Sequence, residues 1–167
     1  MRQNLNTHQE NKILDLPHLK KALKYWRFHE KKIVFTNGCF DLLHPGHIEY
    51  LNNARSLGDV LIIGLNTDDS VKRLKGENRP INNEDDRAIM MASLECVSAV
   101  VHFSEDTPAD LINHILPDIL VKGGDYTKET IVGAQSVEEA GGIVKVIPFK
   151  EGYSSTKLIE KISKANG

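Results

Sequence analysis

The 167-residue chain is long enough for one full hydrophobic core and too short for two comfortable domains. Its 40% apolar and 26% charged residues are typical of a soluble globular protein, and a net charge of −2 without a basic run argues against nucleic-acid binding. No apolar stretch reaches the about 20 residues of a membrane span. Two distant cysteines, Cys39 and Cys96, show neither disulfide nor zinc spacing, so we expect a cytoplasmic protein that binds no membrane.

A helix is predicted for Leu16–His29, after a loose tail. The apolar residues Leu16, Leu19 and Leu23 share one face of this helix, and Asp15 precedes it as a cap. Residues 1–30 are therefore expected to form an N-terminal tail and helix ahead of a single domain that spans residues 31–167.

An alternation of strands and helices follows, and it predicts a parallel sheet. Runs of apolar residues have the length of buried strands at Lys32–Thr36, Val60–Leu65, Val97–Phe103, Ile119–Val121 and Ile143–Ile147. Helical patterns lie at Pro45–Leu57, Asp69–Leu74, Glu84–Glu95, Pro108–Leu116, Ala134–Ala140 and Ser154–Lys164. Apolar strands separated by helices are typical of a sheet covered on both faces. We therefore predict an α/β fold with a Rossmann-like, doubly wound, parallel five-stranded sheet and helices on both faces.

Polar segments follow several of the predicted strands. They are Thr36–His47, Asn66–Asp69, Lys122–Asp125 and Gly152–Thr156. In a doubly wound sheet, ligands bind beyond the carboxyl ends of the strands, where the strand order switches. We expect these segments, which are distant in sequence, to converge on one rim and form a ligand site.

The segment Thr36–His47, T-N-G-C-F-D-L-L-H-P-G-H, has the features of a phosphate site. Pro45 favours the start of a helix there, which places His44 and His47 at a helix N-terminus. Free backbone N–H groups and the helix dipole favour bound anions at that end, and the two glycines of the segment let a ligand approach the backbone. A histidine pair at a helix start can also simply cap or pack. The preceding strand and glycine turn favour the functional interpretation.

The other polar segments have structural alternatives as well. The glycines of Lys122–Tyr126 suit a solvated turn, but the place of this segment after a strand favours a ligand. The hydroxyls of Ser154–Thr156 exceed what a helix cap needs and could cradle a phosphate. Asp41 could bind a ligand or metal, or only hold its turn. Basic residues near the loop at 75–83 could form a solvated face, or one or two of them could close over a triphosphate: Lys72, Lys75, Arg79 and Arg87.

Together these segments resemble the nucleotidyltransferase superfamily whose signature is the H-x-G-H motif. The likeness is greatest to the D-glycero-β-D-manno-heptose 1-phosphate adenylyltransferases, which often form the second domain of a bifunctional heptose kinase/adenylyltransferase. It rests on G-C-F-D-L-L-H-P-G-H, G-L-N-T-D-D-S-V-K-R-L-K-G, N-R-P-I, V-K-G-G-D-Y and G-Y-S-S-T-K, in this order over residues 31–162. Because the chain has no room for a kinase domain, it resembles the single-function form.

The resemblance implies transfer of AMP from ATP to D-glycero-β-D-manno-heptose 1-phosphate, giving ADP-heptose and pyrophosphate for lipopolysaccharide core biosynthesis. It implies that the catalytic residues are His44, His47 and Lys75. The implied nucleotide-binding residues are Thr36, Asn37, Gly38, Cys39, Phe40, Gly46, Lys122, Gly124, Asp125, Ser154, Ser155 and Thr156. The implied substrate-binding residues are Asp41, Asn66, Asp68 and Arg79. Mg²⁺ would accompany the phosphates, no metal-ligating side chains are predicted, and a homodimer is expected because dimers are common in this superfamily.

Three other functions remain as alternatives. A cytidylyltransferase could act on glycerol 3-phosphate or another alcohol phosphate, but such enzymes tend to show G-D-D-W where this chain has G-G-D-Y. A regulatory nucleotide-binding protein without turnover would be expected to lose the two histidines or the Lys122 segment, and this chain keeps both. A structural α/β subunit would leave the convergence of polar segments unexplained.

Overall fold

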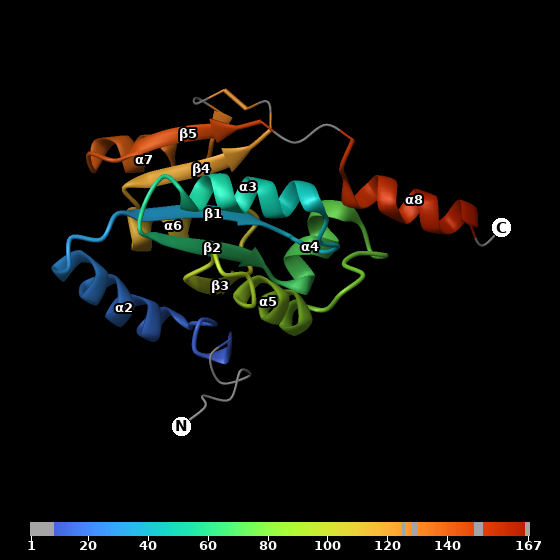
Figure 1. The fold of residues 1–167 in the computed structure, drawn as a ribbon, viewed down its shortest axis with the longest axis horizontal. Coiled ribbons are helices and arrows are strands. Elements are labelled where there is room, and N and C mark those ends of the chain that lie inside the picture. The colour runs from blue at the N-terminus through green and yellow to red at the C-terminus, as the bar shows by residue number, and fades with distance from the viewer. Residues whose placement is uncertain (1–8, 125, 128–129, 149–151, 166–167) are drawn as a thin grey trace.

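The protein folds around a parallel sheet whose strand order is β3-β2-β1-β4-β5 (Figure 1). The computed structural model describes residues 9–124, 126–127, 130–148 and 152–165. The strands are β1 (Ile33–Gly38), β2 (Val60–Asn66), β3 (Ala99–Phe103), β4 (Ile119–Gly123) and β5 (Ile143–Ile147). All neighbouring strands pair in parallel, so the predicted Rossmann-like sheet is confirmed.

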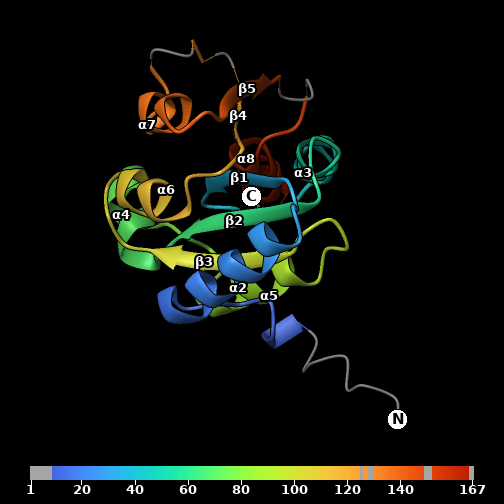
Figure 2. The same ribbon diagram turned by 90° about the vertical axis from the view of Figure 1, so that its left-hand side faces the viewer.

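Helices cover both faces of the sheet, as predicted (Figure 2). Apolar residues of α3 and α5 pack on one face, and those of α2, α6 and α7 pack on the other. No helix in the described parts of the chain is long and apolar enough to cross a membrane. The helices are α2 (Leu16–Phe28), α3 (Pro45–Arg55), α4 (Asp68–Lys75), α5 (Glu84–Ala92), α6 (Ala109–Ile115), α7 (Ala134–Glu139) and α8 (Ser155–Ala165).

The two cores follow from the alternation of side chains along each strand. Ile33 and Phe35 of β1 pack with α2 and α6, whereas Val34 packs with α3 on the opposite face. Successive residues of a strand point to opposite faces, so a sheet buried on both faces needs apolar residues throughout. Strand β2 meets this requirement completely, because all of its residues are buried.

The N-terminal helix α2 is part of the core. Asp15 caps it by accepting a 2.8 Å hydrogen bond from the His18 N–H, as the sequence predicted. Leu19 and Leu23 are buried against the sheet. Just before the helix, the Leu14 N–H donates to the Val100 carbonyl at 2.8 Å, which ties the segment to the edge strand β3.

Replacing Leu19 with alanine is expected to lower the free energy of unfolding by about 2–5 kcal/mol, because Leu19 is fully buried and a cavity would remain. Urea unfolding followed by circular dichroism measures the change. The neighbouring exposed residue provides the control, Lys20→Ala, which is expected to unfold like the unmodified chain. Equal stability of the two variants would contradict the packing of α2 against the sheet.

Candidate active site

Two adjoining cavities lie at the carboxyl ends of β1 and β4, where the strand order reverses. Their volumes are about 280 and 320 Å³, and both are lined by Asn37, Gly38, Cys39, Lys122 and Tyr126. The smaller one, the phosphate cavity, is also lined by Phe40, Asp41, His47, Tyr50, Lys75, Gly123 and Ser155. The larger one, the side cavity, reaches Asn66, Leu74, Phe103, Asp106, Thr107, Pro108, Leu120, Thr130, Ile131 and Val132. The predicted convergence of distant polar segments is therefore confirmed.

The two histidines of the H-P-G-H motif form a stacked pair at the N-terminus of α3. The helix begins at Pro45, as predicted, and His44 is its N-cap residue. The Nδ1 atom of His44 accepts a 3.3 Å hydrogen bond from the His47 N–H, so its ring proton lies on Nε2. The ring centroids are 3.7 Å apart with an interplanar angle of 14°. Both imidazoles thus stand at a helix end that favours anions.

The glycine of the motif is required by this stacking. A Cβ atom at Gly46 would lie 3.1 Å from Nδ1 of His44 and 3.1 Å from Cβ of Tyr153. Both distances are tighter than ordinary van der Waals contacts, so a side chain at this position would displace the His44 ring or the segment that leads into α8.

Both imidazoles are uncharged at neutral pH in the free protein. Burial, together with the nearby charges of His44 and Lys75, lowers the pKa of His47 to about 4. Burial also lowers the pKa of His44. The buried Nδ1 atom of His47 has no hydrogen-bond partner within the described chain. Since buried polar atoms are rarely left unpaired, this atom is well placed to contact a ligand in the phosphate cavity.

The turn after β1 carries a strained residue beside the histidines. Phe40 has a φ of +44°, in the left-handed region that side chains other than glycine rarely adopt. Its ring is buried and meets the His47 ring edge-on, with a centroid distance of 5.3 Å. At Gly38, a Cβ atom would lie 3.0 Å from the Phe40 ring, so glycine gives this ring its space.

Two lysines bring positive charge to the cavities. Lys122 lies between them and donates a 3.1 Å hydrogen bond from Nζ to Oδ1 of Asn37, and its Nζ is 5.7 Å from the centre of the Tyr126 ring. Burial lowers the pKa of the Lys122 ammonium. Lys75, at the end of α4, lines the phosphate cavity with His47. A phosphate there would meet two ammonium groups and the His47 imidazole, against which the His44 ring stacks.

The start of α8 and the end of β4 complete the rim. The Ser155 hydroxyl lines the phosphate cavity and donates a 3.0 Å hydrogen bond to the Leu42 carbonyl. The Ser154 carbonyl accepts the Leu158 N–H in the first turn of α8, and Thr156 is exposed. After β4, Gly124 has a φ of +111° and donates its N–H to the Ile147 carbonyl at 3.0 Å. The predicted nucleotide-binding residue Asp125 lies outside the described residues.

Several residues predicted to contact ligands have partners within the protein. The Thr36 hydroxyl is fully buried and lies 2.6 Å from the Tyr50 hydroxyl, so Thr36 does not line either cavity. Asp68 forms an ion pair with Arg87, and Arg79 forms one with Asp41. Neither Asp68 nor Arg79 lines the cavities, and their contact with a substrate stays a prediction. The expectation that Arg87 is solvated or closes over a triphosphate is also wrong, because its side chain is completely buried.

The two remaining predicted substrate-binding residues line different cavities, and further residues line the cavities without having been predicted. Asn66 lines the side cavity while its amide donates a 2.9 Å hydrogen bond to the Ser70 hydroxyl. Asp41 lines the phosphate cavity, but its carboxylate accepts hydrogen bonds from the loop before α5.

Tyr126 was not predicted from the sequence as a lining residue, although Tyr126 is part of the K-G-G-D-Y segment. The apolar wall of the side cavity was not predicted either, because apolar residues at strand ends, such as Phe103, were assigned to the hydrophobic core.

The described residues offer no cluster that would hold a metal ion. No group of three histidine, cysteine, aspartate or glutamate side chains is arranged to ligate one there. The carboxylates that line the cavities among the described residues, Asp41 and Asp106, are paired with arginines.

Comparison with known proteins places the chain in a family. The model of the family described as cytidylyltransferase-like matches residues 35–161. The chain belongs to this family. The predicted resemblance to nucleotidyltransferases is thereby confirmed.

Sequence relatives are bifunctional proteins, as the resemblance implied. The bifunctional protein HldE of Haemophilus influenzae strain PittGG is 57% identical over 150 residues, which are 90% of this chain and 32% of that protein. The same-named protein of Helicobacter hepaticus is 52% identical over 162 residues, 97% of this chain and 32% of that protein. The chain therefore spans about a third of the length of these relatives.

Solved structures share the fold. A lipopolysaccharide core biosynthesis protein from Thermoplasma volcanium is 28% identical, with a TM-score of 0.58 over 74% of this chain and 99% of that one. Pantoate-beta-alanine ligase from Francisella tularensis matches with a TM-score of 0.60 at 15% identity, over 91% of this chain and 76% of that one, and it shows the fold alone.

The His47 imidazole of the free protein is expected to titrate near pH 4 in NMR spectra of the ring protons, because burial disfavours its charged form. In the unfolded chain in urea it should titrate near the ordinary value of about 6.5. Between these values the unfolded chain binds more protons, so the contribution of His47 to stability is full above about pH 6.5 and is lost as the pH falls toward 4. Protonation of His47 in the folded free protein above pH 6 would show that burial does not keep this ring uncharged.

Proposed function

We propose that this protein is an adenylyltransferase that transfers AMP from ATP to D-glycero-β-D-manno-heptose 1-phosphate and releases pyrophosphate. The product would be ADP-heptose, a precursor for the heptose of lipopolysaccharide core or a related glycan. The observation that carries the proposal is the stacked, uncharged His44–His47 pair at a helix N-terminus, in which His47 lines a cavity together with two lysines. The high identity to bifunctional HldE proteins over nearly the whole chain supports this branch of the family.

The proposed reaction needs alignment and charge stabilisation more than a strong base. A sugar 1-phosphate is an anion near neutral pH, so its phosphate oxygen can attack the α-phosphorus of ATP directly. A new phosphorus–oxygen bond forms to the sugar phosphate, and the bond from the α-phosphorus to the departing pyrophosphate breaks. Positioned donors that meet the developing charge account for most of the acceleration in such reactions.

The phosphate cavity supplies donors of this kind. The Nδ1 atom of His47 is buried without a hydrogen-bond partner among the described residues, and Nε2 of His44 carries a proton. Lys75 and Lys122 add two positive charges on either side of the turn after β1. An arriving polyphosphate favours protonated imidazoles, so we expect the low pKa of His47 to rise when ATP binds.

The remaining assignments complete the proposal. ATP would enter with Mg²⁺ on its phosphates, and the partners are small molecules and a second copy of the chain in a cytoplasmic homodimer. Asn66 would contact the sugar phosphate from the side cavity. The nucleotide contacts would come from Asn37, Gly38, Cys39, Phe40, Gly46, Lys122, Gly124, Asp125, Ser154, Ser155 and Thr156.

Measurement of pyrophosphate release tests this function. The protein is incubated with Mg²⁺, each nucleoside triphosphate in turn and a panel of sugar and alcohol phosphates. Release with ATP that depends on heptose 1-phosphate is the expected result. Release only with CTP and glycerol 3-phosphate or a similar alcohol phosphate would assign the alternative cytidylyltransferase activity.

His44→Ala and His47→Ala are each expected to lower kcat at least about a hundredfold, because each removes a donor aimed at the transferring phosphate. Pyrophosphate release measures the loss, and circular dichroism checks that the fold survives. His114→Ala is the matched control, since His114 is exposed on α6 away from both cavities. Near-normal turnover of either motif variant would remove the basis of the proposal.

Lys122→Met keeps much of the side-chain volume and removes the charge between the cavities. We expect kcat/KM for ATP to fall about tenfold or more, because a buried ammonium beside phosphates is replaced by an apolar group. Lys145→Met on β5 is the control, since Lys145 is exposed and lines neither cavity. Equal kcat/KM for the two variants would exclude Lys122 from the phosphate site.

A further inference from the structure

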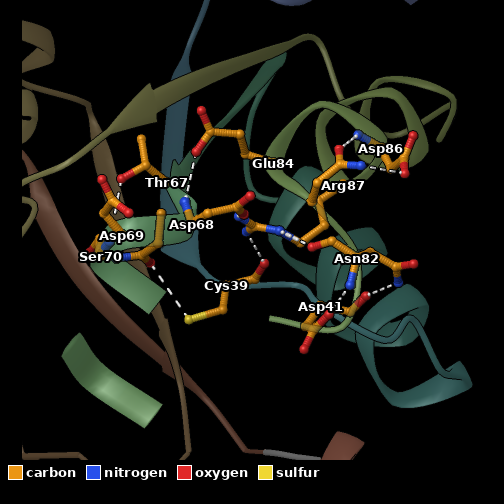
Figure 3. A network of polar contacts seen from close by, with 12 residues as sticks. Cys39, Asp41, Thr67, Asp68, Asp69, Ser70, Asn82, Glu84, Asp86 and Arg87 are labelled. Carbon is orange, nitrogen blue, oxygen red and sulfur yellow. Dashed lines mark hydrogen bonds and ion pairs between the residues drawn. The ribbon is translucent and has the colours of Figure 1, made fainter. Parts of the chain in front are cut away.

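A buried arginine outside the cavities connects the segments that form them. Arg87, in the first turns of α5, has no exposed surface. Its Nη1 donates to the Cys39 carbonyl at 2.7 Å, and its Nε donates to the Asn82 carbonyl at 3.0 Å. Its Nη2 forms a 2.7 Å ion pair with Oδ1 of Asp68 (Figure 3). One guanidinium therefore ties together the turn after β1, the start of α4 and the loop before α5.

Burial of the Arg87 charge costs desolvation free energy, and its hydrogen bonds show which parts of the backbone it holds. A buried guanidinium is tolerated only where its donors are matched, and its planar fork reaches several acceptors at fixed angles. Only one acceptor of Arg87 is a carboxylate, whereas the other two are backbone carbonyls. Its contacts thus fix the course of the backbone at Cys39 and Asn82.

Asp41 makes a second set of contacts with the same loop. Its carboxylate accepts 2.9 Å hydrogen bonds from the N–H groups of Ile81 and Asn82, and a 2.8 Å bond from Nε of Arg79. The Asn82 amide returns a 2.7 Å bond to the Asp41 carbonyl. Burial opposes ionisation of Asp41, but these hydrogen bonds outweigh it and lower its pKa. The carboxylate is therefore charged and held in place.

These contacts enclose the strained residue of the turn. Cys39 and Asp41 are the neighbours of Phe40, whose left-handed backbone is unfavourable for a residue with a side chain. Such a conformation persists only where the surroundings hold it. The Phe40 ring meets His47 edge-on at 5.3 Å between centroids.

We propose that Arg87 and Asp41 are positioning residues that clamp the chain on both sides of Phe40 and thereby hold the Phe40 ring against His47 in the geometry needed for nucleotidyl transfer. We name these contacts the Arg87–Asp41 brace. The inference rests on the proposed function for its effect on turnover. It assigns no contact with substrate to either residue.

Arg87→Lys tests the brace, because lysine keeps the charge beside Asp68 but lacks the planar fork that reaches the two carbonyls. We expect kcat to fall about tenfold or more, since small misplacements in a catalytic site are costly. We also expect the pKa of His47, measured by NMR on the free protein, to rise from about 4 toward its ordinary value as the Phe40 ring moves away. Arg27→Lys is the matched control, since Arg27 on α2 also donates to two backbone carbonyls, those of Ile115 and Leu116, but lines neither cavity. It should change neither quantity.

Asn82→Ala gives an independent test that leaves no buried charge unpaired. It removes only the side-chain bond to the Asp41 carbonyl, so we expect smaller changes in the same directions. An unchanged His47 pKa in folded Arg87→Lys overturns the inference, whether or not turnover falls. If Arg87→Lys does not fold, an unchanged His47 pKa in Asn82→Ala overturns it instead. Absence of turnover in the unmodified protein would contradict the proposed function alone, because the NMR measurement needs no activity.

Discussion

The position of β1 in the sheet is the constraint on which the rest of the structure depends. Strand β1 pairs with β2 on one side and with β4 on the other, so the chain leaves it in one direction and later returns on the opposite side. The connections that follow β1 and β4 therefore run to opposite sides, and a crevice opens between them at the carboxyl ends of these two strands. The turn after β1, the start of α3 and Lys122 at the end of β4 all face this crevice.

Burial gives the histidine pair its chemical character. In water an imidazole near neutral pH is partly charged, but burial and the nearby charges of His44 and Lys75 lower the pKa of His47 and keep it uncharged in the free protein. A site that is uncharged at its imidazoles and positive at its lysines and helix end attracts polyphosphate. In the proposed mechanism the imidazoles gain protons when phosphate charge enters, which suits stabilisation of a departing pyrophosphate better than proton abstraction.

Local features of the site could be predicted from the sequence. Pro45 placed the start of α3 correctly, and Asp15 and the apolar spacing of Leu19 and Leu23 placed α2, because caps and helical periodicity act over a few residues. Some helices and strands begin or end at other residues than predicted, for local reasons. The third strand begins at Ala99 rather than Val97, because the Val97 N–H bonds to the Leu94 carbonyl in a turn.

Contacts between distant segments could not be predicted in the same way. Arg87 was grouped with solvated basic residues, since nothing near it in sequence shows that its partners are Cys39 and Asp68. The Thr36 hydroxyl was predicted to contact a ligand. In the structure it forms a hydrogen bond inside the core with the hydroxyl of Tyr50, a residue of α3. Which polar side chain faces a cavity and which supports its wall depends on tertiary packing, and this is where the sequence was least informative.

In the proposed mechanism the two histidines stabilise a direct displacement at the α-phosphorus and form no covalent intermediate with it. The most direct test is the stereochemical course of the reaction with ATP that carries a chiral α-phosphorothioate and with the sugar 1-phosphate as acceptor. A single in-line displacement predicts inversion of configuration at the α-phosphorus of the nucleotide sugar. Retention would reveal two successive displacements through an enzyme-bound nucleotidyl group and would contradict the proposed role of His44 and His47.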